Sequence, residues 1–184
     1  MSVSEDKRSG LHGLAASLSG WRNRDDTCGA YAAAVMLAGL QDTDCPDLIP
    51  EEIRKPGDSD GKKLVEVLTG CMKGAKKTLP FNVSIGINRF LREYAPDYVQ
   101  KGMRAHWRVL PTRSLVSHEF GAGRFCCLGI VRYRGSRYGN HWVAAYDMKE
   151  TEKGIVFIAH DNWGRAEAEI PARWVNSAVY IREG

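Results

Sequence analysis

The order of helical and strand-like patterns along the chain most restricts the folds available to it. Up to Pro96 apolar residues recur at helical spacing, and from Tyr98 onward they form short runs typical of β-strands. Helices that precede the strands, rather than alternate with them, indicate an α+β architecture with a mostly antiparallel sheet. No repeat or linker divides the chain, so we expect a polar tail at residues 1–10 and one domain at residues 11–184.

The clearest helix is expected at residues 28–39, where alanines stand among Val, Met and Leu. Thr27 precedes it as a capping residue, and Gly39 suits a C-terminal stop. Amphipathic patterns predict two more helices, at residues 62–68 and 85–94. Strands are expected at residues 103–110, 125–133, 141–148, 154–160, 166–170 and 178–182, with short helices at 114–120 and 171–175.

Composition excludes several classes of protein. The net charge of +4 over 184 residues is too mild to imply nucleic-acid binding. Five cysteines at irregular spacing favour free thiols in a reducing compartment over a disulfide framework. No stretch approaches the roughly 20 apolar residues of a membrane span, and the N-terminus lacks a secretory signal. We therefore expect a cytoplasmic protein, or one exported by a route that needs no such signal.

Cys28 is the first candidate for chemistry because it begins the clearest helix. A helix N-terminus stabilises the negative charge of a thiolate, which is the reactive form of cysteine. Gly29 would let a substrate backbone approach closely. The competing interpretation is a buried structural cysteine, which is the commonest fate of a free thiol.

Two later residues would complete a catalytic group. His141 opens an apolar strand, and Asp161 follows the end of the next strand, so a hairpin would bring the two together. If the helix packs on that sheet, Cys28, His141 and Asp161 would act as nucleophile, base and orienter. Alone, each has an ordinary structural interpretation. The other histidines that compete for the role of base are His12, His106, His118 and His160.

The residues around these positions resemble the papain-like cysteine peptidase superfamily. TCGA at residues 27–30 is similar to its nucleophile helix, HWVAAY at 141–146 to its histidine strand, and DNWG at 161–164 to its orienter turn. GRFCCLGI at 123–130 looks closest to the double-glycine peptidases that process bacteriocins. The resemblance covers about residues 20–182. It implies N-terminal helices that carry the nucleophile, packed on a C-terminal antiparallel sheet.

The superfamily usually carries a glutamine six residues before the nucleophile, where its amide helps to form the oxyanion hole. Arg22 stands there in this chain, and Asn23 lies one residue nearer to Cys28. Asn23 would offer an amide and Arg22 a positive charge, each with the backbone N–H of Cys28 as the second donor. The sequence leaves both open.

The loop before His141 is expected to overhang the cleft. Arg134 and Arg137 alternate there with tyrosines and would grip an acidic or extended substrate, although a solvated loop is equally consistent with the pattern. Three neighbours of the expected triad, namely Asn140, Trp142 and Trp163, are assigned to substrate binding with them.

We therefore expect a thiol hydrolase that cleaves a peptide or isopeptide amide through a thioester, with a thiol pKa well below its usual ~8.5. The same triad would serve a secreted toxin or effector that hydrolyses peptidoglycan, deamidates or transfers acyl groups. A third alternative is a catalytically inactive binding module. No paired Cys or His ligands suggest a metal, and no motif suggests a cofactor. The expected partner is a peptide or protein substrate, not nucleic acid.

Overall fold

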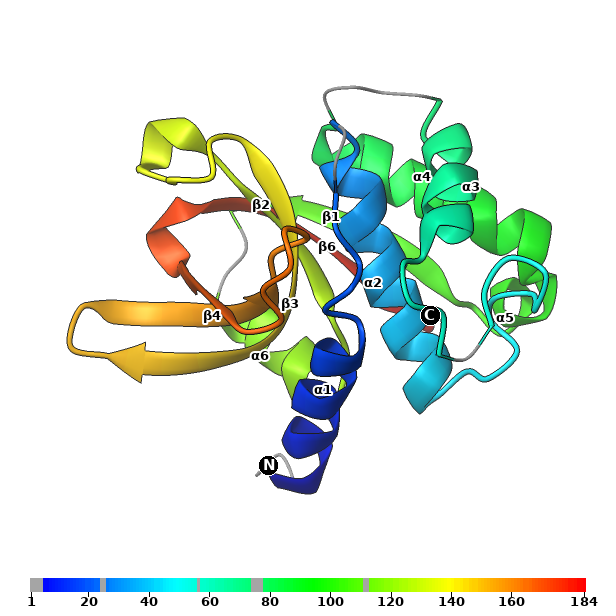
Figure 1. Cartoon of the computed structure of the whole chain (residues 1–184), viewed down its shortest axis with the longest axis horizontal. Helices are drawn as coiled ribbons and strands as arrows, with labels where there is room; N and C mark the ends of the chain where they lie inside the picture. Colours follow the sequence, from blue (N-terminus) through cyan, green and yellow to red (C-terminus); the bar gives the residue numbers. More distant parts are fainter. Residues whose placement is uncertain (1–4, 24–25, 56, 74–77, 111–112) are drawn as a thin grey trace.

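The computed structural model describes residues 5–23, 26–55, 57–73, 78–110 and 113–184. These residues form six α-helices, two short 3-10 turns and one six-stranded antiparallel sheet, so the predicted α+β class is confirmed (Figure 1). The helices are α1 (Glu5–Ser17), α2 (Cys28–Thr43), α3 (Lys62–Cys71), α4 (Pro80–Tyr94), α5 (Pro96–Gln100) and α6 (Arg113–Gly121). The strands are β1 (Arg104–Val109), β2 (Cys126–Ile130), β3 (His141–Thr151), β4 (Gly154–His160), β5 (Ala168–Pro171) and β6 (Val175–Arg182).

The sheet has the order β1-β6-β2-β3-β4-β5, which leaves β1 and β5 at its two edges. Helices α2 to α5 gather on one side of it (Figure 1). Because side chains alternate along a strand, adjacent Cys126 and Cys127 enter different cores. Cys127 packs with the helical layer, where its thiol contacts Met36, whereas Cys126 packs on the opposite face with Phe120 of α6. All five cysteines are free thiols.

Helix α2 is the central helix of the helical layer. Every residue from 29 to 41 is buried, which a helix apolar on all sides requires. Its alanines let it approach β3 and β2 closely. The expected stop at Gly39 is wrong, because α2 continues to Thr43. Gly39 is needed for packing instead, since a Cβ there would lie 2.6 Å from the ring of Phe125.

Other helix boundaries differ from the predicted ones for local reasons. Residues 5–10, expected in a polar tail, belong to α1. Helix α4 begins at Pro80, five residues before the expected start, because proline suits the first turn and the Asn82 side chain accepts the N–H of Leu79. Residues 171–175 hold no α-helix, because a 3-10 turn, η2 (Ala172–Trp174), joins the end of β5 to the start of β6. Within the described part of the chain, no helix is both long and apolar enough for a membrane crossing.

Candidate active site

Cys28 is the first residue of α2 and lies at the edge of the helical core, partly buried. Its thiol lies near enough to the backbone N–H of Trp142, the second residue of β3, for this N–H to act to lower the thiol pKa. The packing of α2 on β3 therefore sets the thiol against the main chain immediately after His141. The start of α2 and the start of β3 are therefore neighbours.

The surroundings of the thiol favour its neutral form. Burial raises the pKa of Cys28, and the nearby carboxylate of Asp26 acts in the same direction. The backbone N–H groups of Trp142, Gly29 and Cys28 itself act to lower the pKa but do not outweigh burial. The expectation of a depressed thiol pKa is therefore wrong for the resting protein.

The imidazole of His141 is buried and has a defined tautomer. Its Nε2 lies 2.8 Å from the backbone carbonyl oxygen of Asp161. A carbonyl oxygen only accepts, so Nε2 carries the proton and Nδ1 keeps its lone pair. No described residue hydrogen-bonds Nδ1. Burial lowers the pKa of His141, against the opposing effect of Asp161, so the ring is poised as a neutral base.

Two aromatic rings hold this imidazole. Tyr138 stacks on it nearly parallel, with centroids 5.7 Å apart and an angle of 8°. Trp163 lies 4.7 Å from the imidazole and 5.0 Å from Tyr138, so the three rings pack against one another. Trp163 stays 51% exposed and covers the histidine toward solvent. Sequence reasoning singled out the segment containing Tyr138 but missed its contact with His141.

The carboxylate of Asp161 is occupied by its own turn. One oxygen, Oδ1, accepts the backbone N–H groups of Trp163 at 2.8 Å and Arg165 at 3.0 Å. The other, Oδ2, accepts the hydroxyl of Tyr138 at 3.2 Å. Asp161 therefore contacts His141 through its backbone carbonyl, whereas the sequence suggested the side chain. The carboxylate fixes the turn that places this carbonyl, and the tyrosine that stacks on the ring.

Asn162 and His160 support the same turn from the helical side. Asn162 is buried with a φ of 61° and donates its Nδ2 to the carbonyl oxygen of Trp142 at 2.9 Å. His160 donates Nε2–H to the carbonyl of Leu18 at 2.8 Å and accepts the N–H of Asn162 at 3.2 Å. These bonds tie α1, β3 and β4 together beneath the site. Sequence analysis did not identify Asn162, although asparagine is favoured at positive φ.

Comparison with known protein families and with curated proteins finds no match for this chain.

The remaining histidines are engaged elsewhere. His12 on α1 contacts Glu167 at 2.7 Å and Asp147 at 3.3 Å. His118 contacts Glu119 on α6, and His106 stacks on Tyr180 at the β1 edge. His160 is bonded as described above. Of the five histidines, His141 is the one that directly precedes Trp142, whose backbone N–H acts on the Cys28 thiol.

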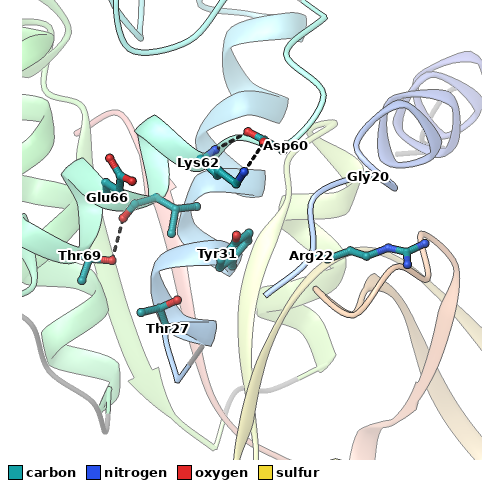
Figure 2. Close-up of a pocket in the computed structure, with 9 residues that line it drawn as sticks. Gly20, Arg22, Thr27, Tyr31, Asp60, Lys62, Glu66 and Thr69 are labelled. Carbon is teal, nitrogen blue, oxygen red and sulfur yellow. Dashed lines mark hydrogen bonds and ion pairs between the residues drawn. The ribbon is translucent and has the colours of Figure 1, made fainter. Parts of the chain in front are cut away.

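The side chains of Asn23 and Arg22 lie in different surroundings. The side-chain oxygen of Asn23 accepts the hydroxyl of Thr27 at 3.3 Å, so Asn23 lies against the residue that precedes Cys28. Arg22 packs over Gly164, where an added Cβ would lie 2.6 Å from Nε of the arginine. Figure 2 shows its side chain directed away from Thr27 and Tyr31. Of these two side chains, only that of Asn23 is hydrogen-bonded to the residue before Cys28.

Some of the residues expected to bind substrate are buried and others are exposed. Gly29 is buried, and Thr78 fills the space beside it, 2.5 Å from where a Cβ would stand. Trp142 is also buried and donates Nε1–H to the Thr78 carbonyl at 2.9 Å. Asn140 is exposed and accepts the N–H of Arg132. These three contacts maintain the walls of the site.

The two arginines of the preceding loop differ. Arg134 donates Nε–H to the carbonyl of Arg173 at 2.6 Å, so this side chain ties the two 3-10 turns together. Arg137 is exposed and lies over Tyr138, 5.6 Å from the ring centroid. Because Tyr138 stacks on His141, Arg137 is the arginine nearer the imidazole.

A cavity of ≈ 480 Å³ lies beside the start of α2 (Figure 2). Thr27 and Tyr31 contribute one wall and α3 the other, with Arg22 and Gly20 at the rim. Charges of both signs line it, and Lys62 forms an ion pair with Asp60 at 3.1 Å. Cys28 does not line this cavity, although Thr27 directly precedes it.

Proposed function

We propose that this protein is a papain-like cysteine hydrolase that cleaves amide bonds, with Cys28 as nucleophile and His141 as base. One observation carries the proposal: the Asp161 carbonyl fixes the proton on Nε2, which leaves Nδ1 unprotonated in a ring that begins the strand beside the thiol. A neutral imidazole with a free lone pair next to a cysteine is the arrangement that nucleophilic catalysis requires.

The shifted pKa values favour general-base activation over a preformed ion pair. A buried, neutral thiol would transfer its proton to His141 Nδ1 as the sulfur attacks the substrate carbonyl. The backbone N–H of Cys28 and the amide of Asn23 would stabilise the oxyanion. The imidazolium would then protonate the leaving amine, and water would hydrolyse the thioester to release the acid. Asp161 positions the imidazole throughout.

The papain-like assignment has physical support in the arrangement of the elements. A buried helix that starts at the cysteine packs on an antiparallel sheet, and the histidine begins the strand beside it. The half-exposed Trp163 packs on His141, and the cation of Arg137 lies over the neighbouring Tyr138; together they suit an extended peptide with an acidic residue. A peptide or protein segment is therefore the proposed substrate class.

Mass spectrometry of substrate mixtures tests the proposal. Wild-type protein and the Cys28→Ala variant would be incubated with a peptide library, cell-wall fragments and intact proteins. New peptide termini that appear only with the wild type support an amide hydrolase. Cys71→Ala serves as the matched control, because Cys71 is also a partly exposed free thiol. Deamidated or acyl-transferred products that need Cys28 would redirect the substrate class, and products that persist in Cys28→Ala would refute the site.

A further inference from the structure

Strand β1 is an edge strand, and the backbone groups on its outer edge are only partly hydrogen-bonded. At Ala105 the side chain of Asn88 takes the place of a neighbouring strand: its Oδ1 accepts the Ala105 N–H and its Nδ2 donates to the Ala105 carbonyl, both at 2.8 Å. Backbone groups that face one edge recur every second residue. The N–H and C=O groups of Trp107 and Val109 therefore also point outward, and no described residue hydrogen-bonds them.

Exposed apolar side chains concentrate around these free groups. Trp107 is 48% exposed and Val109 54%, and both project toward α4 because they alternate with the same parity as Ala105. Phe81 on α4 lies 6.4 Å from the Trp107 ring. Of the eight large hydrophobic side chains that are exposed in the described part of the chain, six lie in or next to the first half of α4 and the end of β1. They are Leu79, Phe81, Ile85, Trp107, Val109 and Leu110.

The opposite face of the same strand is basic. Arg104, His106 and Arg108 alternate with the apolar residues and are exposed. Neither arginine forms an ion pair with a described carboxylate, since Arg104 donates only to backbone carbonyls. On the neighbouring strand Arg182 is neutralised by its ion pair with the buried Glu119, so the positive charge of this face comes from β1 itself. The strand thus presents free backbone groups with an apolar stripe on one side and a positive stripe on the other.

We propose that β1 binds an extended, acidic segment of a partner protein as a seventh strand of the sheet. An added strand hydrogen-bonds at Trp107 and Val109, and its alternate residues face α4 and the arginines in turn. The matching segment therefore alternates apolar with acidic residues. The positive stripe favours an acidic partner. A second copy of this chain is disfavoured, because pairing two β1 strands would bring like charges together. The opposite edge differs, because β5 is four residues long and ends in Pro171.

This surface adjoins the candidate active site but does not include it. Leu79 follows Thr78, which packs on Gly29 and accepts the Trp142 indole. In the sheet register, Val109 pairs with Ser177 near the end at which Ile130 pairs with His141. Binding at β1 needs neither the thiol nor the imidazole. The proposed strand binding can therefore be tested independently of the proposed hydrolase activity.

The test uses the full chain carrying Cys28→Ala, which prevents turnover, and a synthetic peptide of alternating glutamate and valine with blocked ends. NMR hydrogen exchange reports on each amide. The expected result is that the peptide protects the N–H groups of Trp107 and Val109, whereas Ala105 changes little because Asn88 already occupies it. Trp107→Ser and Arg108→Glu should each weaken binding by about tenfold or more.

Matched controls distinguish specific binding at this surface from nonspecific binding. Tyr133→Ser removes another exposed aromatic ring and Lys153→Glu reverses a charge on the β3–β4 hairpin, and both should bind as the parent does. A peptide with lysine in place of glutamate should bind at least about tenfold more weakly. The proposal is overturned if the Glu-Val peptide leaves the Trp107 and Val109 amides unprotected at millimolar concentration. It is equally overturned if Arg108→Glu binds unchanged, or if the protein sediments as a dimer that Trp107→Ser dissociates.

Discussion

His141 Nε2 lies 2.8 Å from the backbone carbonyl oxygen of Asp161, and the Asp161 carboxylate points elsewhere, into its own turn and toward Tyr138. The carbonyl alone suffices to hold the proton on Nε2. The negative charge of Asp161 therefore acts on the imidazole from a short distance, without a direct hydrogen bond.

This relationship predicts a mild effect of Asp161→Asn. The amide oxygen still accepts the N–H groups of Trp163 and Arg165, and the backbone carbonyl still accepts from His141. We expect acylation of Cys28 to slow by less than about tenfold, against the ~10⁴-fold loss typical when a carboxylate alone fixes the histidine tautomer. Asp161→Ala should lower the free energy of unfolding by about 1–3 kcal/mol, because it frees buried donors. A loss of reactivity in Asp161→Asn as large as in His141→Ala would contradict this account.

The raised thiol pKa predicts how alkylation depends on pH. Only the thiolate reacts with iodoacetamide, so a pKa above the ordinary value of 9.0 makes the rate at Cys28 climb through and beyond pH 9. Burial also raises the pKa of Cys71, which provides an internal control in each digest. Peptide-resolved mass spectrometry from pH 5 to 10 measures both thiols. A plateau of fast labelling at Cys28 below pH 6, removed by His141→Ala, would indicate a preformed ion pair instead.

The sequence predicted the elements better than the contacts between them. Strand β4 has its expected bounds, because an apolar run between Gly154 and the polar turn leaves no other choice. The helix end predicted at Gly39 is wrong, because a glycine late in a helical pattern is typical both of a helix stop and of close packing against an aromatic ring. The role of the Asp161 carbonyl was out of reach as well. Which oxygen of an aspartate meets the histidine depends on the turn geometry, which residue types do not determine.

The pKa of Cys28 was also unpredictable from sequence, for a different reason. A helix N-terminus lowers a thiol pKa and burial raises it, and the sequence reveals the first effect but not the second. Burial of the thiol depends on α2 packing against β3, which is a tertiary feature.

His160 should make stability depend on pH. Burial lowers its pKa below the ordinary 6.5, so the unfolded chain binds a proton more readily than the folded one. Its contribution is complete above about pH 6.5 and is lost as the pH falls. His160→Ala should cost about 1–3 kcal/mol at pH 7.5 through the lost bonds to Leu18 and Asn162, and should make the loss between pH 7 and 5 shallower. Urea unfolding measures both, with His106→Ala as control; an unchanged slope in His160→Ala would count against this role.

Gly29→Ala should disturb the wall of the site. The new Cβ would meet Thr78 Oγ1 at 2.5 Å and displace a residue whose carbonyl accepts the Trp142 indole. We expect a loss of about 1–3 kcal/mol in the free energy of unfolding, partly restored by adding Thr78→Gly. Gly13→Ala is the control, because nothing lies within 4 Å of its Cβ and it should stabilise α1 by about 0.5–1 kcal/mol. Equal thermal unfolding of Gly29→Ala and wild type would rule out this contact.

Acylation of Cys28 by 4-nitrophenyl acetate at pH 7.5 tests the nucleophile and its base most directly. Stopped-flow absorbance follows release of nitrophenolate, and peptide mapping locates the thioester in wild type and in His141→Ala. The account predicts a burst that places the acetyl group on Cys28 well ahead of Cys71, and a burst slower by about 10²–10⁴-fold in His141→Ala. Acetylation of Cys28 and Cys71 at equal rates, or a burst that His141→Ala leaves unchanged, would contradict it.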